Sequence, residues 1–242
     1  MNFVVDIGNT RIKAAIFDEA NLKSVSVFES SRAFLAAFKV LPLGVSQSIL
    51  SSVTEDYNQI YAHLKQLGPC LLFEKDTPVP ISNKYQSIAT LGSDRLAAAV
   101  GAYSLFPETN VLNIDTGTCI KYNFVTASGE YLGGAISPGL KMRINALHTF
   151  TARLPLIEQN FKYKELIGKN TTHAILSGTQ VAALLEADGF ISEYKKKFPD
   201  LTVIISGGDT EFFEKQLKNS IFARPNLVLE GLNIILENNA QN

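Results

Sequence analysis

The sequence predicts an α/β protein built from two related domains with a cleft between them. A strand, an Asp-x-Gly turn with a nearby threonine, and a second strand occur at Asp6 and again at Asp115, 109 residues later. Short apolar runs of strand type alternate with stretches of helical periodicity along the whole chain. The 242 residues, 46% of them hydrophobic, suffice for one large domain or two small ones. We expect residues 1–107 and 108–242 to form the two halves.

Residue patterns predict the elements of the first half in order. An apolar strand over residues 3–5 runs into Asp6, Gly8 and Asn9 signal a turn, and alternation over residues 12–16 predicts the returning strand. The elements expected next are a helix over 31–40, a strand over 48–53, a helix from about 55 to 67, a strand over 71–73, a loop over 78–92 and an alanine-rich helix over 94–105. Loops as long as this one are usually functional or disordered.

The second half repeats the opening pattern. Strands are expected over 110–114 and 120–124, on either side of the second Asp-x-Gly turn. The elements predicted after them are a strand over 131–136, a turn at 137–139, helices over 140–149 and 172–187, a strand over 203–206, a helix from 209 and a strand- and helix-like segment over 227–236. Strand, turn and strand followed by further strands and helices in both halves indicate a duplicated domain.

Composition limits the classes of partner. The chain has 22 Lys and Arg against 23 Asp and Glu, a net charge of -1, so we expect no nucleic-acid partner. Two cysteines and three histidines lie without metal-binding spacing, which argues against a zinc site or a disulfide framework. The acidic Asp6 follows only five residues, and the apolar runs are shorter than the ~18 residues of a spanning helix. We therefore expect no membrane partner and a cytoplasmic location.

The two Asp-x-Gly turns have the composition of phosphate-binding loops. Backbone N–H groups exposed in a glycine-containing turn bind phosphate oxygens, and Thr10 and Thr118 add hydroxyl donors. Lys13 adds a positive charge on the strand that follows. The carboxylates of Asp6 and Asp115 would repel phosphate unless a cation lay between them, so they are candidate ligands for Mg²⁺ or a monovalent ion.

Three other segments allow a structural or a functional interpretation. Ser206-Gly207-Gly208, between a strand and a helix, is either a simple turn or a backbone surface for a flat base. The segment Gly92–Arg95 either starts a helix, with Ser93 or Asp94 as its N-cap, or places a carboxylate beside a guanidinium to accept a proton and bind an anion. Its residue chemistry favours the cap. Three glycines in Gly133–Gly139 indicate close approach of a ligand or another backbone.

Four segments in this order resemble the motif set of the type III pantothenate kinases. They are Asp6–Lys13, Gly92–Arg95, Asp115–Thr118 and Gly133–Gly139, and the likeness extends over about residues 3–236. Many actin-like and sugar-kinase-like ATPases share the first motif, whereas Gly-x-Asp-Arg and Gly-Gly-x-Ile-x-Pro-Gly are more specific. The resemblance implies an actin-like, ribonuclease H-like ATPase fold and a homodimer. It also implies ATP-dependent phosphorylation of pantothenate, the first step of coenzyme A synthesis.

The resemblance assigns roles to individual residues. It implies that ATP, carried with Mg²⁺ or another divalent cation, is bound by Asp6, Ile7, Gly8, Asn9, Thr10, Arg11, Ile12, Lys13 and Thr118. It makes Asp94 the general base and Asp115 a ligand of a monovalent cation, K⁺ or NH₄⁺. Pantothenate would be bound by Tyr85, Gly92, Ser93, Asp94, Arg95 and Thr171, the last reaching it across the dimer interface.

Two departures from the family pattern and two alternatives remain. Cys119-Ile120-Lys121 stands where small or hydroxyl residues are more usual, and Ser206 stands in place of a threonine. One alternative is a kinase of another small alcohol, because phosphate motifs do not select the acceptor. The other is a non-catalytic nucleotide-binding regulator, against which the presence of Asp94, Asp115 and Lys13 argues.

Overall fold

Two compact units make up the chain. The computed structural model describes residues 1–40, 42–54 and 57–240. The first unit contains Met1–Glu108, Val125–Leu132 and Asn226–Asn242, and the second contains Thr109–Phe124 and Gly133–Pro225. The C-terminal segment thus belongs with the N-terminal unit, which a single boundary after residue 107 does not anticipate. The predicted domain bounds themselves stay a prediction.

A five-stranded sheet forms the centre of the first unit, with strand order β3-β2-β1-β4-β5. The strands and helices of the first unit are β1 (Asn2–Ile7), β2 (Ile12–Asp18), β3 (Asn21–Phe28), α1 (Ser31–Ala37), β4 (Gln47–Ser52), α2 (Asn58–Leu67), β5 (Cys70–Leu72), β6 (Ser82–Asn83), the 3₁₀ turn η1 (Ile88–Thr90), α3 (Ser93–Leu105) and α8 (Leu227–Ala240). Strands β1, β2 and β3 are antiparallel, whereas β4 and β5 run parallel to β1.

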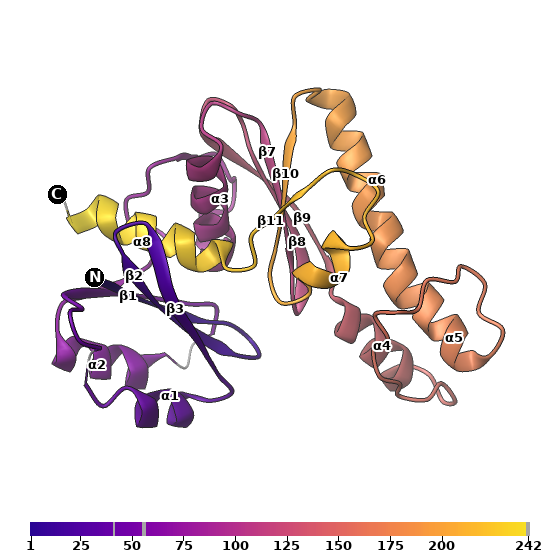
Figure 1. Ribbon diagram of the computed structural model, residues 1–242, viewed down its shortest axis with the longest axis horizontal. Coiled ribbons are helices and arrows are strands. Elements are labelled where there is room, and N and C mark those ends of the chain that lie inside the picture. Colours follow the sequence, from indigo (N-terminus) through magenta and orange to yellow (C-terminus); the bar gives the residue numbers. More distant parts are fainter. Residues whose placement is uncertain (41, 55–56, 241–242) are drawn as a thin grey trace. The chain divides into compact units, whose positions relative to one another are not determined.

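Alternation along β1 sends side chains to two different layers of helices. Phe3 and Val5 lie in a core cluster with Phe34 of α1 and Ile60 of α2. Val4 lies in a second cluster that contains residues of α3 and α8. Figure 1 shows α1 and α2 on one face of this sheet and α3 and α8 on the other. Successive residues of a strand point to opposite faces, so both faces of β1 are buried.

Small residues let α3 and α8 pack with their backbones in contact. A Cβ atom on Gly231 would overlap the carbonyl of Ala97, and one on Gly101 would lie 2.8 Å from the carbonyl oxygen of Leu227. The alanine-rich pattern that predicts α3 therefore has a packing cause, because larger side chains would hold the two helices apart.

The second unit is built on strands of a six-stranded sheet with order β11-β10-β7-β8-β9-β6. Its elements are β7 (Val111–Thr116), β8 (Cys119–Val125), β9 (Glu130–Pro138), α4 (Leu140–Thr149), α5 (Thr171–Leu176), the π-helical turn η2 (Ser177–Val181), α6 (Ala182–Lys197), β10 (Thr202–Ser206), α7 (Thr210–Glu214) and β11 (Phe222–Ala223). Strand β10 runs parallel to β7 and to β11. Residues 125–132, the tip of the β8–β9 hairpin, belong to the first unit, where β6 pairs with Glu130 and Tyr131.

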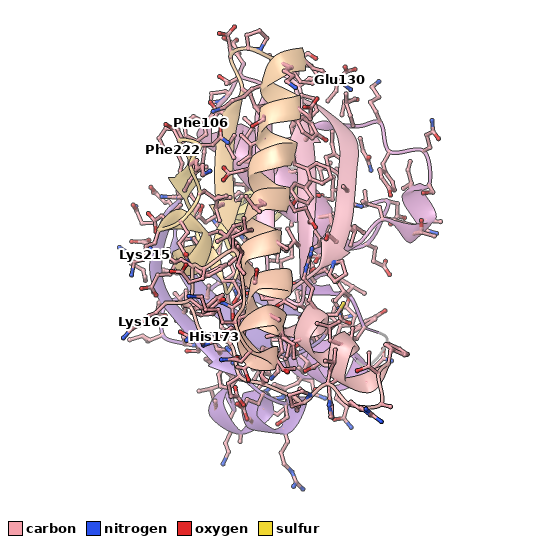
Figure 2. All side chains as sticks on the ribbon, turned by 90° about the vertical axis from the view of Figure 1, so that its right-hand side faces the viewer. Phe106, Glu130, Lys162, His173, Lys215 and Phe222 are labelled. Carbon is pink, nitrogen blue, oxygen red and sulfur yellow. The ribbon has the colours of Figure 1, made fainter. Side chains whose placement is uncertain are left out.

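One long helical stretch covers the sheet of the second unit. Helix α5, the turn η2 and α6 follow one another without a break, with His173 near the start (Figure 2). By length and composition alone, Thr171–Lys197 could cross a membrane. Ala183, Ala187 and Ile191 are instead buried in the core of this unit. Burial in the protein thus accounts for part of the apolar character of the stretch, of whose most apolar window 39% is buried.

Several predicted elements differ from the observed ones. Strand β3 was not expected, although Val25 and Val27 alternate with Ser24 and Ser26 in it, and both valines are exposed. The segment 227–236 is entirely helical and forms part of α8. The long predicted loop over 78–92 contains β6 and η1. The predicted start of the helix at 55 lies outside the described residues, and α2 begins at Asn58.

Candidate functional site

The first Asp-x-Gly turn joins β1 to β2 and is open to solvent. The N–H of Gly8 donates a 3.0 Å hydrogen bond to the carbonyl of Arg11, which closes the turn. Asn9, Thr10 and Arg11 at its tip are exposed. Lys13 is half-buried and lies opposite Asp6 in the strand register. The turn therefore presents donors and a positive charge at its surface, as phosphate binding requires.

The second Asp-x-Gly turn joins β7 to β8 and is fixed by its neighbours. The N–H of Gly117 donates to the carbonyl of Cys119 at 3.1 Å, and the N–H of Gly139 donates to the carbonyl of Thr118 at 3.1 Å. The hydroxyl of Thr116 donates to the carbonyl of Ser206 at 2.8 Å. Asp115 and Thr116 are buried, and only Thr118 at the tip is exposed.

Glycines let two flanking segments reach the backbone of the second turn. A Cβ atom on Gly139 would overlap the carbonyls of Gly117 and Thr118. One on Gly207, whose φ is +95°, would overlap the carbonyl of Thr116. Both glycine segments that the sequence offers as sites of close approach thus contact protein backbone at these positions.

The carboxylate of Asp115 is paired within the chain. The Nζ atom of Lys121 lies 2.6 Å from Oδ2 of Asp115, and the Ser206 hydroxyl donates to Oδ1 at 3.4 Å. The side chain of Asp115 is 10% exposed and that of Lys121 is 18% exposed. The amide of Asn113 donates to the Ser206 hydroxyl at 2.9 Å and holds it in place. A charged pair so little exposed requires close compensation of both charges, and this geometry supplies it.

The segment Gly92–Arg95 starts helix α3, as the structural interpretation expects, but the predicted cap is wrong. Gly92 is the N-cap and gives no side-chain cap bond, while Oδ1 of Asp94 accepts a 2.8 Å hydrogen bond from the N–H of Arg95 within the first turn. The hydroxyl of Ser93 instead lies 2.9 Å from that of Ser51 and donates to the carbonyl of Ser52 at 3.1 Å. The carboxylate of Asp94 is half-buried in the first helical turn, where the helix dipole favours negative charge.

Tyr85 and Arg95 lie together in the first unit. Nη1 of Arg95 donates to the Tyr85 hydroxyl at 3.5 Å, and the guanidinium lies 5.4 Å from the centre of the tyrosine ring. Arg95 is only 5% exposed. The Tyr85 ring also stacks on Tyr131, with 6.2 Å between ring centres. A buried guanidinium held against an aromatic ring is suited to bind an anionic group in a defined orientation.

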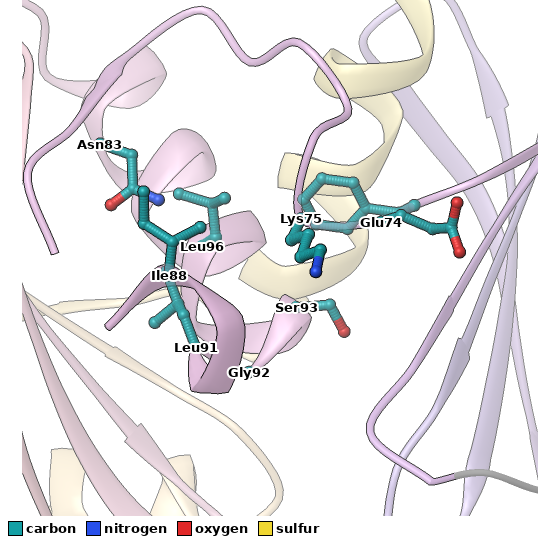
Figure 3. A pocket seen from close by; sticks show the side chains of 9 residues that line it. Glu74, Lys75, Asn83, Ile88, Leu91, Gly92, Ser93 and Leu96 are labelled. Atoms are coloured by element: carbon teal, nitrogen blue, oxygen red, sulfur yellow. The ribbon is translucent and has the colours of Figure 1, made fainter. Parts of the chain in front are cut away.

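A small, solvent-open pocket adjoins the start of α3 (Figure 3). It is lined by Phe73, Glu74, Lys75, Asn83, Ile88, Leu91, Gly92, Ser93 and Leu96. Phe73 follows β5, so the pocket lies where parallel strands of the first sheet end. Ligands of open α/β sheets commonly bind at the carboxyl ends of the strands.

Asp209 lies beside the second turn. Its N–H donates to the carbonyl of Thr116 at 3.0 Å, directly after the Gly207-Gly208 pair. Burial raises the pKa of its carboxyl to about 6. Asp209 is also the N-cap residue of α7, but its side chain makes no capping hydrogen bond to that helix.

A partly buried arginine, Arg143, fixes the Ser137-Pro138-Gly139 turn. Arg143 donates from Nε to the carbonyl of Pro138 at 2.8 Å and from Nη2 to the hydroxyl of Ser137 at 2.6 Å. Nη2 also lies 2.6 Å from Oε2 of Glu186 on α6. The Tyr122 hydroxyl donates to the other oxygen of Glu186 at 3.3 Å. Burial and this nearby carboxylate raise the pKa of the Tyr122 hydroxyl well above its usual range.

The sequence-predicted site residues fall into both units. The first unit holds the Asp6–Lys13 turn, Tyr85 and Gly92–Arg95, and within it the structure brings Tyr85 and Arg95 into contact. The second unit holds Asp115 and Thr118 on one turn, and Thr171 at the exposed first turn of α5. Sequence reasoning missed the roles of Ser51, Arg143 and Glu186. Their contacts are long-range, and no local motif signals them.

Solved structures with related folds support the predicted fold class. A Campylobacter jejuni protein described as a Baf family transcriptional activator has a TM-score of 0.66 and 19% identity, covering 99% of this chain and 100% of that one. An inorganic polyphosphate/ATP-glucomannokinase from Arthrobacter sp. strain KM has a TM-score of 0.52 and 14% identity, covering 99% and 98%. At these identities the likeness concerns the fold alone, and it confirms the two-domain actin-like ATPase fold.

The relatives found by sequence identify the family of the chain, which the solved structures do not. The family model for type III pantothenate kinase matches residues 2–193. A type III pantothenate kinase from Christiangramia forsetii is 45% identical over 242 residues, covering 99% of each chain. One from Bacteroides fragilis is 42% identical over 241 residues, covering 99% of this chain and 98% of the relative. This chain therefore belongs to the type III pantothenate kinase family.

Proposed function

We propose that this protein transfers the γ-phosphate of ATP to pantothenate and so catalyses the first step of coenzyme A synthesis. The proposal is carried by likeness to named type III pantothenate kinases over 99% of the chain, with the acidic and basic motif residues of the reaction all present. A bacterial metabolic enzyme of this kind would work in the cytoplasm.

The first turn is the proposed phosphate site. Its exposed Asn9, Thr10 and Arg11 offer donors, and the half-buried Lys13 offers a charge. Thr118 at the tip of the second turn is the further proposed ATP contact. Among residues 1–40, 42–54 and 57–240, no group of three or more His, Cys, Asp or Glu is arranged to hold a metal. A divalent ion bound with ATP would offset charge on the phosphates and would be held largely through them.

Asp94 is the proposed general base. Its half-buried carboxylate, at the start of α3, would accept the proton of the primary hydroxyl of pantothenate as that oxygen attacks the γ-phosphorus in line. The transition state of such transfers is usually loose, so positioning matters more than the strength of the base. The pair formed by Tyr85 and Arg95, supported by Gly92 and Ser93, would hold the anionic substrate.

A coupled assay of ADP release with ATP, Mg²⁺ and pantothenate tests the proposal. Turnover that requires pantothenate, with a product heavier by one phosphate, is the expected result. Asp94→Asn should lower kcat by about 10²–10⁴-fold with the fold unchanged, whereas Arg95→Ala should mainly raise KM for pantothenate. Wild-type turnover by Asp94→Asn would remove this residue from its role. Turnover with other alcohols but none with pantothenate would reject the acceptor.

We also propose that two copies of the chain associate. The second unit exposes a set of large apolar side chains on or after β9 and α4, which are Ile136, Phe150, Leu156, Leu166 and Ile167, with exposed fractions of 59–85%. In α4 and the residue after it, Leu140 and Ile144 are buried and Phe150 is 85% exposed. Exposed apolar groups of this kind favour association. Light scattering after gel filtration should give twice the 26.5 kDa mass, and Phe150→Asp should shift it toward the monomer.

The family resemblance also predicts a monovalent cation, K⁺ or NH₄⁺, at Asp115, and Thr171 as a substrate contact from the second copy. Thr171 is exposed, as that contact would need. The predicted cation site is not open in the same way, because the carboxylate of Asp115 already forms an ion pair with Lys121. The residues around Asp115 do not fit an additional monovalent ion in this arrangement.

A further inference from the structure

A lysine ammonium lies where the family resemblance would put a free monovalent cation. Lys121 is on β8, directly after the second turn, and its Nζ is 2.6 Å from Oδ2 of Asp115. Both side chains are largely shielded, at 18% and 10% exposure. This differs from a surface ion pair such as Lys196 with Glu193, whose side chains are 70% and 68% exposed. An ion pair that is shielded from water holds its geometry and its charge compensation more strongly.

The rest of the Asp115 carboxylate is also engaged by the chain. Oδ1 accepts from the Ser206 hydroxyl at 3.4 Å, and a Cβ atom on Gly207 would come within 2.6 Å of that oxygen. A second cation at this carboxylate would have to lie close to the Lys121 ammonium. Two like charges a few ångströms apart repel each other, so the ammonium and a free ion compete for the position.

The ammonium of lysine can do the chemical work of the free ion. It has the same single positive charge as K⁺, and its three N–H donors bind oxygen atoms as the free NH₄⁺ ion does. At this place it neutralises Asp115, which would otherwise repel phosphate groups approaching Thr118 at the tip of the same turn. Its attachment to β8 fixes its position, so no ion has to be recruited from solution.

We propose that Lys121 serves as a built-in monovalent cation, so that phosphoryl transfer by this enzyme requires no K⁺ or NH₄⁺. The inference rests on the proposed kinase function and adds to it the way in which the charge of Asp115 is balanced. Lys121 acts as a positioning residue through Asp115 and the second turn.

The first test compares turnover in KCl and in choline chloride at equal ionic strength. The wild-type rate should differ by less than about twofold between the two salts. Lys121→Thr, which places a hydroxyl residue at this position, exposes the carboxylate of Asp115, and its rate should be raised about tenfold or more by K⁺ or NH₄⁺, since a shielded carboxylate without a partner is strongly unfavourable. Lys196→Thr is the matched control in the same unit and should behave as wild type.

The second test does not use turnover. The midpoint of thermal unfolding is measured without substrates in the same two salts. The wild-type midpoint should be equal in both, whereas that of Lys121→Thr should rise by a few degrees in KCl, because a ligand that binds only the folded state stabilises it. If Lys121→Thr does not fold, Lys121→Arg keeps the charge, and K⁺ should change its rate by less than about twofold.

The outcomes separate this inference from the proposed function. Wild-type turnover that K⁺ raises more than about fivefold, or a wild-type midpoint that rises in KCl as that of Lys121→Thr does, would overturn the role of Lys121. K⁺-independent turnover by Lys121→Thr would overturn it as well. A wild type that is inactive with pantothenate in every salt would count against the proposed function, and the unfolding midpoints would still decide the question of the cation.

Discussion

The two Asp-x-Gly turns have nearly the same sequence but opposite environments. In the first turn, Asn9, Thr10 and Arg11 are exposed, and the hydrogen bond from the Gly8 N–H to the Arg11 carbonyl closes the turn from within. In the second turn, Asp115 and Thr116 are buried, and backbone and side-chain groups of distant segments hold it from several sides. A repeated motif has thus been used once as an open loop and once as a packed part of the core.

Because of this difference, we expect substitutions in the two turns to affect different properties, nucleotide binding in the first and folding stability in the second. Changes at the tip of the first turn should affect nucleotide binding more than folding, because Asn9, Thr10 and Arg11 are exposed there. Changes around the second turn should affect folding first, because neighbouring backbone fills the space beside it. The following predictions test this contrast from the largest expected effect to the smallest.

Gly207→Ala should destabilise the protein most. Its φ of +95° is unfavourable for alanine, and the added Cβ would overlap the carbonyl of Thr116. Strain and overpacking together should lower the free energy of unfolding by about 3 kcal/mol. Gly208→Ala is the matched control, because a Cβ there would meet nothing within 4 Å. Urea unfolding of both variants measures the effect, and equal stabilities would contradict the packed character of the second turn.

Arg143→Met should have the next largest effect. The change removes the hydrogen bonds to Ser137 and Pro138 and leaves Glu186 without its charged partner. We expect a loss of about 1–3 kcal/mol in the free energy of unfolding, since these partly buried groups lose their hydrogen bonds to a charged partner. Lys196→Met, which breaks an exposed ion pair, should change stability by less than about 1 kcal/mol. A loss in Arg143→Met no greater than in this control would show that the arginine does not brace the turn.

Gly8→Ala should weaken ATP binding while leaving the stability of the fold almost unchanged. A Cβ atom there would lie 3.3 Å from the carbonyl oxygen of Arg11, a tight contact that a small shift relieves. The free energy of unfolding should change by less than about 1 kcal/mol. The added methyl group would hinder close approach of phosphate, so Kd for ATP measured by calorimetry should rise about tenfold, equal to ~1.4 kcal/mol. Unchanged ATP binding would mean that phosphates do not approach this backbone.

Asp209→Asn should remove a small pH dependence beside the second turn. Burial raises the pKa of Asp209 from 3.8 to about 6, so the folded state holds a proton more tightly than the unfolded state. Its contribution to stability is therefore fully present below pH 4 and is lost as the pH rises through 6. After screening by solvent we expect at most about 1 kcal/mol, measured by urea unfolding at pH 4.5 and 7. The asparagine variant should lose this part of the slope, and an unchanged slope would contradict burial of the carboxyl as its source.

Local signals explain which elements could be predicted. Strands β1, β2, β7 and β10 carry apolar runs next to glycine turns, so their positions follow from sequence. The exposed β3 gives no such signal. Helix α3 was predicted from its alanines, but its cap was not, because Ser93 is drawn away by Ser51 and Ser52 on a strand about 40 positions earlier.

The sequence by itself determined the duplicated α/β plan, the two turns and the family, because repeats and motifs are short-range patterns of residue type. The tertiary structure decided which turn is open and which is packed, that α8 joins the first unit, and that Lys121 meets Asp115. These features depend on segments far apart in the chain or on how a side chain is directed. Burial, close backbone contact and charge pairing arise only when the chain has folded, so they cannot be predicted from the spacing of residues alone.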